Sequence, residues 1–159
     1  MSWEELSALL WKERELLELL LFKIEEEQLV LASGRTRWLA HATREVEVVL
    51  AEIRQQELRR AVTVEGLAES VGCGSQPSLT TLAGHAPEPY PELLRAHRQA
   101  FLALTAEIST MAEANRDLLA AGAKATREAL LGLEQSVGTY GPQGRITGPV
   151  GPRVVDQAL

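Results

Sequence analysis

The stretch that decides the fold runs from Pro91 to Val137 and reads PELLRAHRQAFLALTAEISTMAEANRDLLAAGAKATREALLGLEQSV. Apolar and small residues recur in it at alternating spacings of three and four, the heptad pattern of coiled-coil-like packing. The positions are Leu94, His97, Phe101, Leu104, Ile108, Met111, Asn115, Leu118, Gly122, Ala125, Ala129 and Gly132. The pattern predicts one helix over 91–137, roughly 70 Å long at about 1.5 Å per residue.

Two shorter helices are predicted before it. Ser2 and Glu5 form a capping-box pattern, which predicts a first helix over about 3–32. Gly34 suits the left-handed conformation of a helix end. A second helix then follows over about 36–62, and the short connection predicts an antiparallel hairpin.

The segment between the hairpin and the long helix is irregular in sequence. Thr63 and Ser78 are candidate caps of short helices within 64–84. A continuation of the second helix through 63–71 is the alternative. The end, 138–159, holds five Gly and three Pro without periodicity, which predicts a flexible tail.

Together these elements predict an all-α fold. An antiparallel helical hairpin packs with one long C-terminal helix as an elongated, coiled-coil-like three-helix bundle. We expect a single domain over 1–137 and a Gly/Pro-rich tail over 138–159.

Composition and charge narrow the class of protein. The net charge is −6, and no basic cluster resembles a nucleic-acid footprint. The longest apolar run, around 16–22, is much shorter than the roughly 20 residues needed to span a bilayer, so no membrane insertion is expected. Cys73 is the only cysteine, which agrees with a reducing compartment. The expected location is the cytoplasm.

Catalytic and metal-binding patterns are missing from the sequence. His41, His85 and His97 lie far apart, and there is no Glu-x-x-His, His-x-x-x-His or Cys-x-x-Cys. We expect His97 to be a satisfied or partly exposed core histidine. No enzyme activity, metal or cofactor is therefore predicted.

One segment scans like a helix-turn-helix. Residues 63–74, followed by a capped stretch from Ser78, have the required order of helix, glycine turn and helix. However, residues 63–90 contain no Lys or Arg and three Glu, so they would repel a DNA duplex. A DNA-binding regulator is the least favoured reading.

Helix lengths point to an exposed surface. The first helix reaches roughly 45 Å, so a 70 Å helix packed on it leaves about 25 Å uncovered. The short helices are expected to cover the Pro91 end, which leaves the C-terminal third exposed. Its apolar residues are Leu118, Leu119, Leu130, Leu131, Leu133 and Val137. Such a stripe marks a partner site or a homodimer seam. Asn115 either fixes the helical register or binds the backbone of a partner.

Several short motifs carry a family resemblance. They are Glu57-Leu-Arg-Arg-Ala-Val, a Leu-Ala-x-x-x-Gly turn over 67–72, Asn115-Arg-Asp-Leu-Leu, Leu130-Leu-Gly-Leu, and Thr139-Tyr-Gly-Pro-Gln-Gly-Arg. In this order they resemble the FlgN-type flagellar export chaperones over nearly the whole chain.

The resemblance implies a cytosolic chaperone that holds hook-filament junction (hook-associated) proteins unassembled and delivers them to the flagellar type III export apparatus. It implies a monomer or weak dimer. The cargo-binding residues expected from the exposed stripe and the resemblance are Asn115, Leu118, Leu119, Leu130, Leu133, Val137, Tyr140 and Arg145. The alternative from another class is a self-associating coiled-coil scaffold or adaptor.

Overall fold

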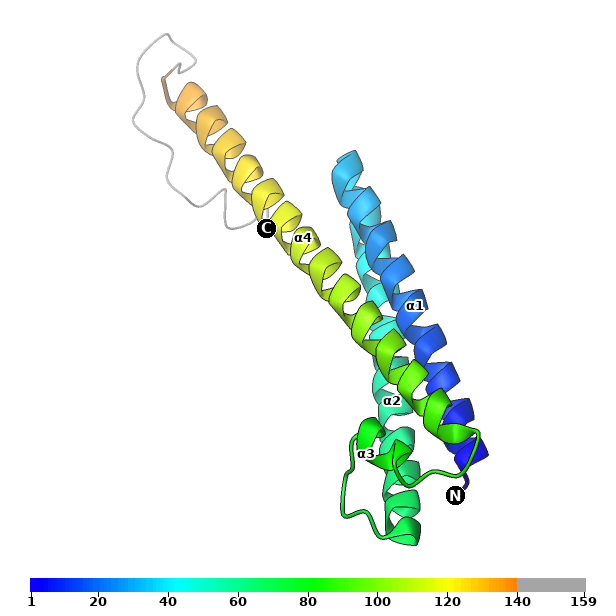
Figure 1. Cartoon of the computed structure of the whole chain (residues 1–159). Coiled ribbons are helices and arrows are strands. Elements are labelled where there is room, and N and C mark those ends of the chain that lie inside the picture. The colour runs from blue at the N-terminus through cyan, green and yellow to red at the C-terminus, as the bar shows by residue number, and fades with distance from the viewer. Residues whose placement is uncertain (140–159) are drawn as a thin grey trace. The chain divides into compact units, whose positions relative to one another are not determined.

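A computed structural model describes residues 1–139, with side chains to residue 136. The elements are α1 (Trp3–Ser33), the 3-10 turn η1 (Thr36–Trp38), α2 (Leu39–Val71), α3 (Leu79–Ala83) and α4 (Tyr90–Thr139) (Figure 1). No strand occurs over this range, so the predicted all-α fold is confirmed. Of the tail predicted over 138–159, residues 138 and 139 belong to α4, and the rest lies outside the described residues.

The chain divides into two compact units. The first is Met1–Asn115, and the second begins at Arg116. α4 is one continuous helix that contributes its first half to the first unit. The single domain expected over 1–137 stays a prediction.

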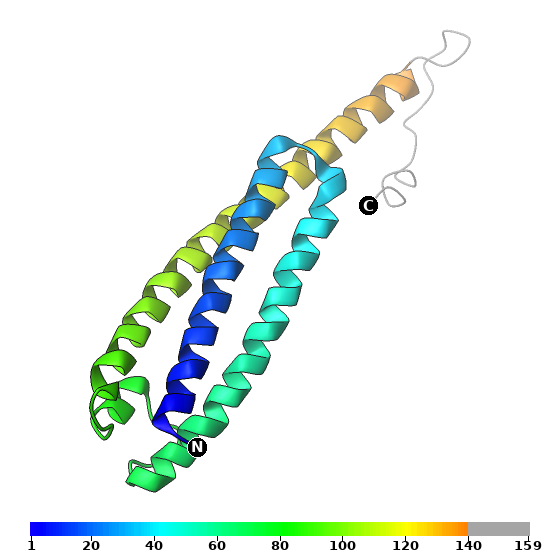
Figure 2. The same ribbon diagram turned by 90° about the vertical axis from the view of Figure 1, so that its right-hand side faces the viewer.

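The predicted hairpin is confirmed at both ends of α1. The Ser2 hydroxyl accepts a hydrogen bond from the Glu5 amide at 3.0 Å, as an N-cap does. Gly34 ends the helix with φ 70°, a left-handed conformation that glycine adopts without a Cβ clash. η1 then turns the chain, and α2 runs back alongside α1 (Figure 2). The second helix thus becomes α-helical at Leu39 rather than at Thr36.

The predicted end of the second helix at residue 62, with a separate helix over 64–71, is wrong, and the alternative of a continuous second helix through 63–71 is confirmed. α2 continues without a break to Val71, where Gly72 caps it at φ 71°. The reason is burial, because Thr63, Val64 and Leu67 lie in the interior and continue the packed face of α2. Of the short helices expected within 64–84, α3 is the one that forms apart from α2. Its Ser78 hydroxyl accepts from the Thr81 amide at 3.1 Å.

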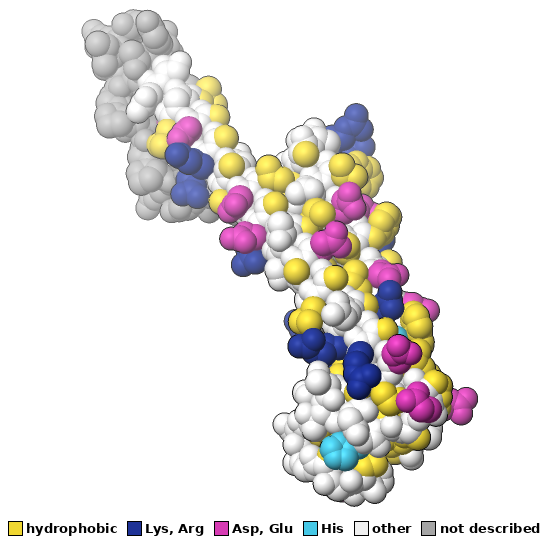
Figure 3. Space-filling model, viewed as in Figure 1, with side chains coloured by type: hydrophobic (Ala, Val, Ile, Leu, Met, Phe, Trp, Pro, Cys, Tyr) yellow, Lys and Arg dark blue, Asp and Glu magenta, His cyan; other side chains and the backbone are white. Residues whose placement is uncertain are grey.

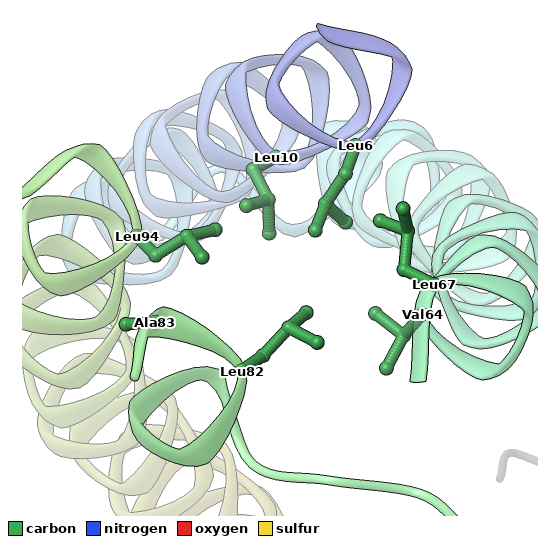
Figure 4. Packing of buried hydrophobic residues seen from close by; sticks show 7 residues of the cluster. All are labelled: Leu6, Leu10, Val64, Leu67, Leu82, Ala83 and Leu94. Atoms are coloured by element: carbon green, nitrogen blue, oxygen red, sulfur yellow. The ribbon is translucent and has the colours of Figure 1, made fainter. Parts of the chain in front are cut away.

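Two apolar clusters hold the first unit together. The first joins α1, the end of α2, α3 and the start of α4, and its side chains point toward one another in Figure 4. Its buried members are Leu6, Leu10, Val64, Leu67, Leu82, Ala83 and Leu94. The second joins α1 and α2 through Leu16, Leu17, Leu20, Ile24, Val49 and Ile53. Against it pack the α4 residues Phe101, Leu104, Ile108, Met111 and Ala112.

The heptad positions of α4 therefore pack in the first unit as far as Asn115. Each predicted position from Leu94 to Asn115 is buried or half-buried. This confirms the packing of the long helix on the hairpin.

Buried polar groups accompany this apolar core. Glu13 is 4% exposed, and its Oε2 lies 3.3 Å from Nε of Arg60, an ion pair whose geometry is not that of a hydrogen bond. Burial raises the pKa of Glu13, while Arg60 opposes that shift. Gln56 donates from Nε2 to the Leu9 carbonyl at 3.1 Å, which ties α2 to α1.

His97 differs from the expectation of a satisfied or partly exposed side chain. It is 2% exposed, and neither ring nitrogen has a hydrogen-bond partner among the described residues. Its ring lies edge-on to Trp11, with centroids 4.7 Å apart, and 6.1 Å from Phe101. Burial lowers the pKa of His97, and the positive charge of Arg14 lowers it further.

Leu10→Ala tests the first cluster. Leu10 is fully buried, so its truncation is expected to cost about 2–5 kcal/mol of unfolding free energy, measured in urea. The matched control is Leu58→Ala, because Leu58 is 70% exposed. This control should change stability by no more than about 0.5 kcal/mol. Equal losses in the two variants would contradict the described core.

His97→Leu tests the buried imidazole. The unfolded chain takes up the His97 proton more readily than the folded protein, so His97 lowers stability as the pH falls below about 6.5. We expect the free energy of unfolding to drop less between pH 7 and pH 5 in the variant than in the wild type. Urea titrations at both pH values measure this difference, and identical drops would show that His97 is not buried as a neutral group.

Candidate functional site

The candidate site is the part of α4 that follows Asn115. Over residues 116–136 every described side chain is exposed or half-buried, although the heptad pattern continues. Leu118 and Leu119 are each 40% exposed, and Leu131 and Leu133 are 50% and 62% exposed. Large apolar side chains at this density on one helix are typical of a surface that binds another protein.

Two neighbouring stripes run along this part of the helix, each at three-and-four spacing. The first continues the heptad seam and, after a leucine, carries only small residues: Leu118, Gly122, Ala125, Ala129 and Gly132. The second has larger side chains and consists of Leu119, Ala123, Thr126, Leu130 and Leu133. We call the second one the leucine stripe. Side by side, they present a ridge of leucines next to a shallow face.

The two glycines of the seam are not required by the described chain. A Cβ placed on Gly122 or Gly132 would meet nothing within 4 Å. Glycine inside a helix costs about 0.5–1 kcal/mol relative to alanine. Alanine at either position would therefore give a more stable helix without a clash in the described chain.

The surface of residues 116–136 carries no excess of positive or negative charge. Residues 116–136 carry three basic side chains, Arg116, Lys124 and Arg127, and three acidic ones, Asp117, Glu128 and Glu134, a net charge of zero. Recognition by this surface would rest on apolar contact and shape. In the described range no group of His, Cys, Asp and Glu side chains could hold a metal ion. No helix between residues 1 and 139 is long and apolar enough to cross a bilayer.

The predicted site residues fall into three groups. Leu118, Leu119 and Leu133 are exposed, and Leu130 is half-buried. Asn115 is buried in the first unit. Val137 lies in α4 beyond the described side chains, and Tyr140 and Arg145 lie outside the described residues.

Asn115 joins three helices. Its Nδ2 donates to the Ile24 carbonyl at 2.9 Å and to Oε1 of Glu27 at 3.1 Å. The other Glu27 oxygen, Oε2, accepts from the Thr43 hydroxyl on α2 at 3.1 Å. The side chain is 2% exposed, and its Oδ1 has no hydrogen-bond partner among the described residues. The donor that could bind a partner is thus engaged with α1, which is the register-fixing arrangement.

Glu27 and Thr43 were not identified from the sequence. They lie 88 and 72 positions before Asn115, and only the register of the packed helices brings them together. Nothing in the local pattern of either residue signals this contact.

The segment that scanned like a helix-turn-helix does not form one. Its first part is the end of the 33-residue α2, and α3 has five residues, none of them Lys or Arg. A groove of about 620 Å³ lies beside it, and its lining includes Arg60, Val62, Glu65 and Leu79. Arg60 is the cation of that lining, and its ion pair with Glu13 leaves no free positive charge there to bind a DNA phosphate.

Asn115→Asp tests the three-helix connection. A carboxylate there would face the Glu27 carboxylate and the Ile24 carbonyl without a hydrogen to donate, so stability should fall more than in Asn115→Ala. The alanine variant itself is expected to lose about 1–3 kcal/mol. Urea unfolding at pH 7 measures both, with the exposed Asp117→Asn as a control that stays near wild type. An aspartate variant as stable as the wild type would exclude the assigned hydrogen bonds.

Comparisons with known proteins place the chain in a family. A search of curated proteins and a search of solved structures return no significant match. A family model described as "FlgN protein" matches residues 1–148. The match extends over both units, and it confirms the resemblance carried by the motifs. The chain belongs to the FlgN family of flagellar export chaperones.

Proposed function

We propose that this protein is a cytosolic chaperone that binds hook-filament junction (hook-associated) proteins through the second half of α4. It would keep them unassembled and deliver them to the flagellar type III export apparatus. The observation that carries the proposal is the unused heptad pattern. The seam positions up to Asn115 are buried or half-buried, and those from Leu118 to Gly132 are exposed.

The free energy available on this surface suits protein binding. Full burial of a leucine contributes about 1.5–3 kcal/mol. Leu118, Leu119 and Leu133 are all at least 40% exposed, so a partner that covered them would gain several such contributions. Part of this gain is lost to the ordering of the partner, which leaves an affinity low enough for later release.

The shape of the surface favours a helical partner. The leucine stripe is a ridge, and the adjacent Gly122, Ala125 and Ala129 leave room for a second backbone to approach. An amphipathic helix of the cargo would lay its apolar face across both stripes. A cargo terminus of this kind would aggregate or assemble if it were left free, and covering it is the function of a chaperone.

The proposal also takes in residues beyond the described side chains. Val137 continues the spacing of the leucine stripe. Tyr140 and Arg145 follow in the motif that resembles the family, so we include them in the cargo contact. Asn115 would contribute by fixing α4 to α1 immediately before the exposed half begins.

A self-associating scaffold is the second candidate function, because the same unused heptad positions could close on a second copy. Sedimentation of the purified chain separates the two. A chaperone that awaits cargo should be a monomer or a weak dimer, and a scaffold should be a stable dimer through seam positions such as Leu118 and Gly122.

Leu119→Asp/Leu133→Asp tests the cargo site. Both side chains are exposed, so the fold should persist, as far-ultraviolet circular dichroism and the thermal midpoint would verify. Capture of junction proteins in a pull-down from a flagellated host should fall at least about tenfold, equivalent to 1.4 kcal/mol.

The matched control is Leu58→Asp/Val62→Asp, which places the same charges on exposed leucine and valine positions of α2. This variant should capture cargo like the wild type. Unchanged capture by the Leu119/Leu133 variant would reject the leucine stripe as the site.

A further inference from the structure

The outer surface of α1 carries a second stripe of exposed apolar side chains, in the first unit, although the Trp11 ring also contacts the buried His97 of α4. At spacings of four and three it presents Trp11, Glu15, Glu18, Phe22, Glu25 and Leu29, which we call the α1 outer stripe. Trp11, Phe22 and Leu29 are 47%, 57% and 67% exposed. From Trp11 to Leu29 the stripe covers five helical turns, about 27 Å. Figure 3 shows hydrophobic and acidic side chains interleaved along this side of the first unit.

Alternation of large apolar side chains with carboxylates restricts what can cover this surface. Burying Phe22 and Leu29 against an apolar partner would also desolvate Glu18 and Glu25, and an uncompensated carboxylate is costly to bury. A partner must therefore bring cations to the same face. The net charge of α1 points the same way, since Trp3–Ser33 holds eight Glu and three Lys or Arg.

The local cations do not neutralise the stripe. Glu15 lies 3.8 Å from Lys12, and Glu18 lies 3.8 Å from Arg14, but these pairs are exposed and contribute little. Glu25 has no ion pair among the described residues. Glu15 and Glu18 can exchange their present partners for those of a bound protein, and Glu25 can accept one without giving up an ion pair.

The two aromatic rings already attract cations. The Arg14 guanidinium lies 5.1 Å from the Trp11 ring centroid, and Lys23 Nζ lies 5.5 Å from that of Phe22. Such cation–π contacts are favourable at exposed sites. The α1 outer stripe thus offers both carboxylates and ring faces to incoming Lys or Arg side chains.

We propose that the α1 outer stripe is a docking surface for a basic amphipathic helix of a second protein, distinct from the cargo that binds the leucine stripe. Apolar residues of that helix pack on Trp11, Phe22 and Leu29, and its Lys or Arg side chains pair with Glu15, Glu18 and Glu25. An anionic membrane is disfavoured by the same carboxylates. The proposal does not depend on the identity of the cargo.

The test uses the full chain and two synthetic peptides of 21 residues. Both carry leucine at heptad positions a and d, and they differ only in having lysine or glutamate at the flanking positions e and g. Binding is measured by fluorescence anisotropy at two salt concentrations. The lysine peptide should bind at least about tenfold more tightly than the glutamate peptide, and its affinity should fall as salt rises.

Variants locate the binding. Phe22→Ser/Leu29→Ser and the triple change Glu15→Gln/Glu18→Gln/Glu25→Gln should each weaken the lysine peptide at least about tenfold. The matched charge control is Glu47→Gln/Glu52→Gln/Glu57→Gln, which removes three exposed glutamates from α2 and should change affinity less than about threefold.

Three results would overturn the proposal. The first is that the control triple loses as much affinity as the stripe triple, since this would indicate unspecific attraction. The second is that Leu119→Asp/Leu133→Asp abolishes peptide binding, since the peptide would then occupy the leucine stripe. The third is a stable dimer in sedimentation that Phe22→Ser/Leu29→Ser dissociates, since a second copy would then be the occupant. If cargo capture is absent while the lysine peptide still binds, the proposed cargo function fails and the docking proposal is unaffected.

Discussion

Packing of α4 residues Leu94 to Asn115 against the α1–α2 hairpin is the interaction on which the first unit depends. Both apolar clusters need it. Leu94 closes the first cluster beside Leu82, and Ile108 and Met111 cover the second. Without α4, the paired helices of the hairpin would expose the face that these residues occupy. A helical hairpin alone buries too little surface to offset its conformational entropy.

Polar groups decide how α4 lies on that face. Leucine and alanine seams tolerate a shift of one heptad, because each layer resembles the next. Asn115 does not tolerate it, since its amide must reach the Ile24 carbonyl and Glu27 together. At the other end His97 occupies a tight place between Trp11 and Phe101. The unpaired polar atoms in the interior lower the stability of the fold. The same polar side chains favour a single alignment of the three helices.

Most of the fold could be predicted from the sequence because its signals are local. Ser2, Gly34 and Ser78 act through the backbone within a few residues of themselves, and each has the predicted role. The prediction that Thr63 caps a separate helix was wrong. A threonine caps a helix start and also packs inside a helix, and only burial against neighbouring elements decides between the two. The same holds for His97, whose isolation depends on Trp11, 86 positions earlier.

The candidate site was predictable in part. The difference in length between the long helix and the hairpin predicted that Leu118, Leu119 and Leu133 are exposed, and they are. The buried state of Asn115 was not predictable, because it depends on the register between α4 and α1. The α1 outer stripe was also missed. In sequence it reads as the solvated face of an acidic helix, and only the exposed fractions of Trp11, Phe22 and Leu29 set it apart.

The end of burial at Asn115 has a consequence for the physics of recognition. Helices gain most of their stability in water from tertiary contacts, and no described side chain of residues 116–136 is fully buried. Gly122 and Gly132 weaken this half further. A partner that packs on it supplies the missing contacts, so its binding free energy and the stability of the helix become one linked quantity. If this segment binds cargo as proposed, the affinity would then be tuned by substitutions that never touch the cargo, through the intrinsic helicity of the segment.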